Sequence, residues 1–227
     1  MEPRIQYAKT KDGVSIAFWS LGEGMPFVSL PVPLPFGHIQ IEWQIPEWRG
    51  LHERMLQKRR VIRYDSRGAG LSDRDVQDYS LDALVLDLET VVDRLGLEQC
   101  ALLGFMASGP VAIAYAARHP ERVSHLVLWH SYVRGSQRVG SPGVGEALEK
   151  LLETNWEVYT ETLTHSAFGW SEGEASNRVA ALLREGLTQE MAQRAWAAID
   201  EFDVTDLLPH VRAPTLVTWS SPQHERG

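Results

Sequence analysis

The residues whose types and spacing point most directly to chemistry lie in the segment Cys100–Gly109. An apolar run ends there in a turn of small residues, and a helical pattern follows over 110–118. A strand, a sharp turn and a helix in this order build a nucleophile elbow, whose G-x-S-x-G motif has the nucleophile at its centre. Gly104 occupies the first glycine position, Met106 the centre and Ser108 the second glycine position.

Met106 is not a competent nucleophile, because a thioether has no proton to lose and is only a weak acceptor. The sequence therefore predicts an enzyme-like scaffold without its usual nucleophile. Elbow nucleophiles hold strained backbone angles, and a methionine gains no catalysis from that strain. We expect either a relaxed turn or a Met106 side chain that fills the space of the nucleophile.

Other side chains are candidates for the vacant roles, each with a structural alternative. Ser108 is the nearest hydroxyl, but a small residue at its position also lets the helix and strand pack closely. His130 follows a predicted strand over 123–129 and is the best candidate general base; the alternative is a polar residue at a strand end. His38 lies in the loop after a predicted strand over 27–30, and His224 lies near the end of the chain.

The remaining patterns predict no metal and no cofactor. The histidines do not show the H-E-x-x-H or H-x-x-E-H spacing of metal ligands, and no Lys-Ser/Thr pair follows the glycines of the 104–109 turn as in a phosphate loop.

Three further segments resemble parts of the α/β-hydrolase fold. Asp65–Asp73 resembles its D-x-R-G-x-G-x-S loop, Ala114–Val123 the helix and turn after its elbow, and Ala213–Val217 its late strand. Tyr7–Trp19 and Arg118–Trp129 look like bacterial α/β-hydrolase modules, which occur alone or beside cyclase or LuxR-type regulatory domains and some of which sense ligands. We expect Asp65 and Arg67 to be structural.

This resemblance implies a site and also its defects. Oxyanion and pocket positions fall on Pro31, Val32, Phe105, Ala107 and His38, where backbone N–H groups rather than the His38 side chain do the work. The catalytic acid would fall near Pro222 or Gln223, and the base would lie beyond residue 227. All three triad roles are then vacant, which predicts the loss of triad chemistry.

Strand patterns alternating with helical patterns predict an α/β fold, with a mostly parallel twisted sheet and helices on both faces. Asp12-Gly13 between alternating apolar residues predicts a hairpin. We divide the chain into a hydrolase core (1–134), a helical cap (135–208) and a shortened C-terminal part of the core (209–227); the alternative to the cap is a helical outer layer with no lid role. The family's final strand and helix are expected to be missing.

Composition limits the classes of partner and compartment. The chain has 227 residues, a net charge of −8 and no basic run, which excludes nucleic acid and anionic membranes as partners. The single cysteine, Cys100, fits a reducing compartment, and the start Met1–Arg4 lacks the apolar stretch of a signal peptide. A cytoplasmic protein is expected.

Three functional hypotheses follow. The chain is a hydrolase-family protein with weak ester or lactone hydrolysis, a noncatalytic module that binds or senses a small apolar ligand, or a truncated product without activity. The apolar segment Thr215–Trp219 is predicted to form a sheet edge, which favours self-association through that edge.

Overall fold

The computed structural model describes residues 2–31, 36–137, 142–168 and 173–219. It is a seven-stranded sheet in the order β1-β2-β4-β3-β5-β6-β7. β1 and β2 are antiparallel to their neighbours, and β4, β3, β5, β6 and β7 run parallel. This is the predicted α/β fold. The strands are β1 (Gln6–Lys9), β2 (Ser15–Leu21), β3 (Met25–Ser29), β4 (Arg59–Tyr64), β5 (Cys100–Phe105), β6 (Val123–Trp129) and β7 (Thr215–Thr218).

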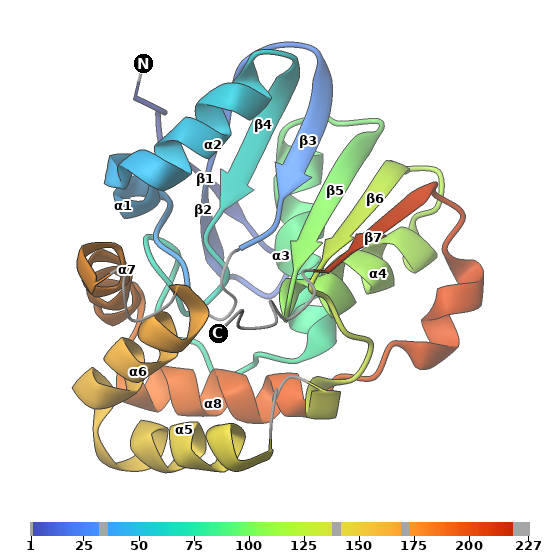
Figure 1. Cartoon of the computed structure of the whole chain (residues 1–227). Helices are drawn as coiled ribbons and strands as arrows, with labels where there is room; N and C mark the ends of the chain where they lie inside the picture. Colours follow the sequence, from blue (N-terminus) through green and yellow to red (C-terminus); the bar gives the residue numbers. More distant parts are fainter. Residues whose placement is uncertain (1, 32–35, 138–141, 169–172, 220–227) are drawn as a thin grey trace, which may run out of the picture.

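Helices cover both faces of the sheet. In the view of Figure 1, α1 and α2 lie on the near side toward the β2 end, and α3 and α4 lie behind the sheet. Ser80 caps α3, since its side chain accepts a hydrogen bond from the Ala83 N–H at 3.2 Å. The α helices on the two faces are α1 (Ile39–Gln44), α2 (Pro46–Leu56), α3 (Leu81–Arg94) and α4 (Ser108–Arg118).

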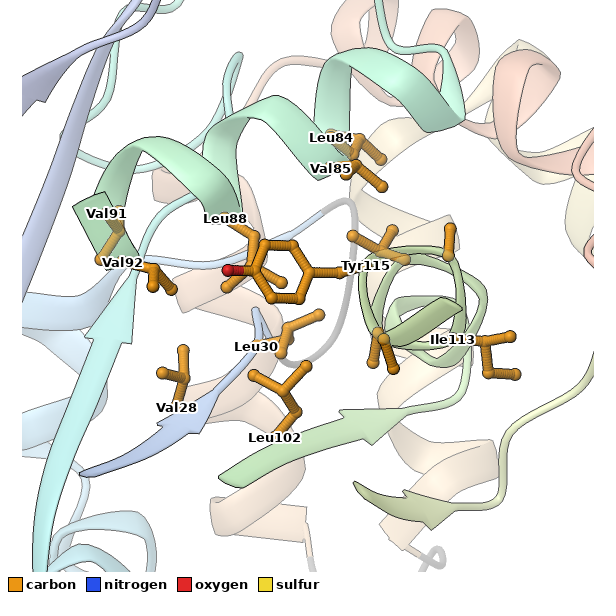
Figure 2. Close-up of a cluster of buried hydrophobic side chains, with 14 of the residues drawn as sticks. Val28, Leu30, Leu84, Val85, Leu88, Val91, Val92, Leu102, Ile113 and Tyr115 are labelled. Carbon is orange, nitrogen blue, oxygen red and sulfur yellow. The ribbon is translucent and has the colours of Figure 1, made fainter. Parts of the chain in front are cut away.

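The main core lies between α3, α4 and the back of the sheet (Figure 2). Leu88 and Val91 of α3, Leu102 of β5 and Tyr115 of α4 all belong to this core, and all four side chains are fully buried. Burying a side chain of this size stabilises the fold by roughly 1.5–3 kcal/mol. The core fixes α3 and α4 against the strands whose carboxyl ends carry the candidate site.

The segment between β6 and β7 is helical. Figure 1 shows its α helices gathered beyond the carboxyl ends of the parallel strands. Its entry and exit are tied together, because the Gly135 N–H donates to the Phe202 carbonyl at 2.8 Å and the Val204 N–H to the Val133 carbonyl at 3.0 Å. The elements are η1 (Gly135–Gln137), α5 (Pro142–Thr154), α6 (Trp156–Phe168), α7 (Gly173–Gly186), α8 (Gln189–Asp200) and η2 (Thr205–His210).

Within the described ranges, no helix is long and apolar enough to cross a membrane.

Candidate active site

The turn from β5 into α4 has the strained backbone of an elbow. Met106 has φ 48, and among the described residues only His130 shares a positive φ without being glycine. This excludes the first of the two expected alternatives, a relaxed turn. Met106 is held in place, because its N–H donates to the Trp129 carbonyl of β6 at 3.0 Å and its carbonyl accepts from the Gly109 N–H at 3.0 Å. Its side chain is 39% exposed.

Two glycines let the strand and the helix approach at this turn. A Cβ on Gly104 would lie 2.8 Å from the Gly109 Cα, and a Cβ on Gly109 would lie 2.3 Å from the Ser131 Oγ. The Ser131 hydroxyl donates to the Gly104 carbonyl at 3.1 Å. Ser131, two residues after the end of β6, therefore closes the same contact, and the sharp turn follows from tight packing of β5, α4 and the chain that leaves β6.

Ser108 lies at the base of the turn and is fully buried. Its Oγ accepts from the Phe105 N–H at 2.8 Å and donates to the Phe105 carbonyl at 2.9 Å. The hydroxyl thus satisfies backbone groups where the strand ends. Its proton and a lone pair are both engaged, which leaves it poorly placed to act as a nucleophile.

His130 lies directly after β6, at the same edge of the sheet as Met106. It has φ 50, and its N–H donates to the Thr218 carbonyl of β7 at 2.9 Å. Its ring centroid is 6.5 Å from that of Phe105. The structure therefore brings together the apex, Phe105 and the candidate base. Ala107, the residue after the apex, is buried and already has helical angles.

The loop after β3 contains the other predicted oxyanion positions. Pro31 is buried, and Val32 lies outside the described residues. His38 is half-buried and begins α1, where its Nδ1 accepts from the Ile41 N–H at 3.4 Å. Desolvation lowers the pKa of His38 below its ordinary value. A neutral ring that accepts through Nδ1 suits a helix cap, so His38 has a structural role as the N-cap of α1.

Buried charges of β4 and α1 hold both ends of this loop. Arg63 donates from Nη1 to the Ser29 carbonyl at 2.9 Å, and from Nη2 to the Glu42 Oε2 at 2.5 Å. Asp65 accepts from the Ile39 N–H at 2.9 Å. Arg63, Glu42 and Asp65 are each at most 2% exposed, so the loop is anchored to groups that water does not reach.

Asp65 and Arg67 both have structural contacts, as expected. Asp65 also accepts from the Leu71 N–H at 2.9 Å, and burial raises the pKa of Asp65 to about 7. Arg67 donates from Nε to the buried Asp87 at 2.9 Å and from Nη1 to Asp12 at 2.8 Å. These pairs fasten the loop after β4 to α3 and to the β1–β2 turn.

The segment between β6 and β7 packs on the same loops. Phe36 is fully buried; its ring stacks on Trp156 at 6.2 Å and meets Trp196 edge-on at 5.9 Å. The Gly70 N–H donates to the Gly186 carbonyl at 2.8 Å. The loops after β3 and β4 are therefore held between the sheet and the helical segment.

Sequence reasoning missed the Glu42–Arg63 pair. An arginine inside the strand pattern 59–64 was a usable signal, because a charge in a buried strand requires a partner. No local pattern singled out Glu42, since a glutamate in a helix is ordinarily a solvent-exposed residue.

Pro222, Gln223 and His224 lie outside the described residues. The described part of the chain has no group of three or more His, Cys, Asp or Glu side chains that could hold a metal ion.

Residues 44–221 match a family model described as alpha/beta hydrolase fold. The chain belongs to the α/β-hydrolase family. Among relatives of this family, it is 36% identical over 115 residues to the AB hydrolase superfamily protein YisY of Bacillus subtilis, covering 50% of this chain and 40% of that one. It is 36% identical over 110 residues to a 2-hydroxymuconate semialdehyde hydrolase of Pseudomonas, covering 48% and 35%. The chain thus spans well under half the length of these two relatives.

Solved structures of the family agree with the fold. An esterase from Exiguobacterium antarcticum has a TM-score of 0.79 at 23% identity, covering 93% of this chain and 79% of the other. A bromoperoxidase from Bacillus anthracis has a TM-score of 0.78 at 19% identity, covering 95% and 81%. At these identities the likeness establishes the shared fold alone.

Proposed function

We propose that this α/β-hydrolase-family chain has a degenerate active site that hydrolyses small apolar esters or lactones slowly, by attack of water and without an acyl-enzyme intermediate. The supporting observation is the pair of strained residues Met106 and His130, at the carboxyl ends of the neighbouring strands β5 and β6. Strain of this kind costs on the order of 1–3 kcal/mol per residue and is concentrated at functional sites.

In the proposed reaction His130 acts as a general base. Its imidazole takes a proton from water while the water oxygen bonds to the acyl carbon. The bond from that carbon to the leaving oxygen then breaks, and the imidazolium returns the proton to the leaving oxygen. In an elbow, the N–H after the apex stabilises the developing oxyanion, and that residue is Ala107.

The experiment measures hydrolysis of p-nitrophenyl acetate and of an acyl lactone. General-base assistance contributes roughly 10²–10⁴-fold, so His130→Gln should lower the rate about 100-fold or more. His125→Gln is the matched control, because His125 is an exposed histidine near the other end of the same strand; it should leave the rate unchanged. Equal rates for both variants would exclude His130 as the base.

A second variant tests the absence of a covalent step. Met106→Ser supplies a hydroxyl at the apex but no triad to activate it, so hydrolysis should begin without a burst of product. A burst that matches the enzyme concentration would reveal an efficient base for that hydroxyl and would contradict the water mechanism.

The second candidate function is noncatalytic binding or sensing of a small apolar molecule. It is favoured by the chemistry of the apex, where a thioether that is 39% exposed offers polarizable apolar surface and no nucleophile. Native mass spectrometry on freshly purified protein, combined with the rate assays, separates the two functions. A retained small molecule with no turnover supports sensing, and turnover that depends on His130 supports hydrolysis.

A further inference from the structure

Three buried polar atoms between the α1–α2 helices and the sheet have no hydrogen-bond partner among the described residues. They are Trp19 Nε1 of β2, Glu42 Oε1 of α1 and His52 Nδ1 of α2. Trp19 is fully buried, and Glu42 and His52 are 1% and 6% exposed. Because buried polar groups of native proteins are nearly always hydrogen-bonded, three such atoms from one part of the fold require a common explanation.

The side chains that carry these atoms share one layer, on the face of the sheet that α1 and α2 cover (Figure 1). The His52 ring meets the Trp19 ring edge-on, with centroids 5.5 Å apart. Trp19 lies opposite Arg63 in the β2–β4 register, and residues paired in this way point to the same side of the sheet. Arg63 donates from Nε to the Glu42 Oε2 at 3.2 Å. Arg63 thus brings the Glu42 carboxylate to the side on which Trp19 and His52 meet.

The three atoms differ in their hydrogen-bonding chemistry. An indole N–H only donates, an ionised carboxylate oxygen only accepts, and each nitrogen of a neutral imidazole either donates or accepts. No two of the three atoms are bonded to each other. A single group that satisfies all of them must therefore accept from Trp19 and donate to both Glu42 and His52.

We propose that this cluster binds one water molecule, which accepts from the Trp19 Nε1–H and donates to Glu42 Oε1 and His52 Nδ1. A buried water typically makes about three hydrogen bonds, and these three use both of its protons. The chemistry selects water among small ligands. A metal cation or an ammonium ion has no lone pair for the indole N–H, and an alcohol has only one hydroxyl proton to donate.

The energetics favour the bound water. A buried donor or acceptor without a partner costs its full desolvation free energy, and a charged oxygen such as Glu42 Oε1 costs more than a neutral group. Immobilising one water costs at most about as much as leaving one such group unpaired. Since the water satisfies three atoms at once, binding it is favourable.

The water extends the buried hydrogen bonds that support the loop after β3. Arg63 donates from Nη1 to the Ser29 carbonyl at 2.9 Å and holds Glu42 Oε2. Through the water, Glu42 is also joined to Trp19 of β2 and His52 of α2. One molecule therefore links β2, α1 and α2 to the pair that anchors this loop.

A crystal structure of the wild-type chain tests the proposal directly. It should show one ordered water within about 2.5–3.2 Å of Trp19 Nε1, Glu42 Oε1 and His52 Nδ1. A map without density at this place, or a direct hydrogen bond between two of the three atoms, would overturn the proposal.

Nuclear magnetic resonance provides the test in solution. The indole N–H signal of Trp19 is identified as the one missing from Trp19→Phe, and in the wild type it should show a nuclear Overhauser effect to a proton at the water frequency. Proton exchange through the His52 ring could produce the same signal. His52→Asn is the control, because its side-chain oxygen keeps an acceptor near the position of Nδ1 without the exchanging ring proton.

The Overhauser effect should persist in His52→Asn, since the water keeps its bonds to Trp19 and Glu42. A wild type without the effect would contradict the proposal, and so would an effect that disappears in His52→Asn. Circular dichroism checks that both variants are folded.

Discussion

Protonation of His52 should by itself lower the free energy of unfolding of this protein in acid. Its ring stacks on Trp43 at 6.1 Å with an interplanar angle of 9°, and it meets Trp19 edge-on at 5.5 Å. It is 6% exposed, and within the described part of the chain its Nδ1 has no hydrogen-bond partner. Burial, and secondly the charge of Arg63, lowers the pKa of His52 from 6.5 to about 3.

The sign and size of the effect follow from proton linkage. A histidine with a depressed pKa binds its proton more readily in the unfolded chain, so His52 taken alone lowers the free energy of unfolding as pH falls below 6.5. With a folded pKa of about 3, His52 lowers the free energy of unfolding by about 2.7 kcal/mol at pH 4.5 and by only about 0.2 kcal/mol at pH 7.

His52→Phe removes the titrating group and keeps a ring between the two tryptophans. Urea unfolding followed by tryptophan fluorescence gives the free energy of unfolding at pH 7 and pH 4.5. The gap between variant and wild type should widen by about 2.5 kcal/mol at the lower pH. The control His210→Gln changes an exposed histidine and should keep the wild-type profile. A gap for His52→Phe that is the same at both pH values would refute the reasoning.

The remaining predictions concern Asp65 and the turn. Burial raises the pKa of Asp65 from 3.8 to about 7, so ionisation of Asp65 lowers the free energy of unfolding as pH rises through this window. In urea unfolding, the free energy of unfolding of Asp65→Asn relative to the wild type should therefore rise by about 2 kcal/mol from pH 5 to pH 7. Gly104→Ala should lower stability by roughly 1–3 kcal/mol in thermal melts, because its Cβ would lie 2.8 Å from the Gly109 Cα. Ser108→Ala should cost about 1–3 kcal/mol through the buried Phe105 backbone groups it leaves unpaired, yet leave any hydrolysis rate unchanged; a rate that falls more than the folded fraction would give Ser108 a chemical role.

His52 and Asp65 act in opposite directions over the same pH range. As pH falls from about 6.5 toward 4, His52 destabilises the fold and Asp65 stabilises it, each by about 1.4 kcal/mol per pH unit. The two effects nearly cancel in the wild type. The single variants are therefore needed to observe either effect. For the double variant, the difference in free energy of unfolding from the wild type should be nearly the same at every pH in this range.

The fold could be predicted because its signals are local. Apolar runs such as 100–103 and 123–129 marked buried strands, and Asp12-Gly13 marked the hairpin, where Gly13 has φ 95. The helical segment was predicted only as a helical cap over 135–208, without the breaks that separate its helices. Asn155 accepts from the Val158 N–H at 3.1 Å, and Thr188 from the Met191 N–H at 3.3 Å. Both are favourable N-cap residues, so both breaks could also have been predicted from the sequence.

The short helix α1 and its contacts could not be predicted in this way. Its six residues, Ile39–Gln44, are too few to show a helical period, and such a helix is stable only through its tertiary packing. The same limit hid the buried set of Glu42, Arg63 and His52. These residues come from α1, β4 and α2, so only the folded chain brings them together.

The geometry of the turn does not depend on the chemistry at its apex. Met106 and His130 keep positive φ because carbonyls of the next strands, at Trp129 and Thr218, accept their N–H groups, and the Gly104–Gly109 contact fixes the direction of α4. A methionine meets these constraints as well as a serine does, since they act on the backbone. The strained turn therefore marks where a site can form in this family's scaffold, and the side chains at that place decide whether it catalyses a reaction. His130 is the side chain on which that decision rests, which is why its substitution, rather than restoration of a hydroxyl at Met106, is the more decisive experiment.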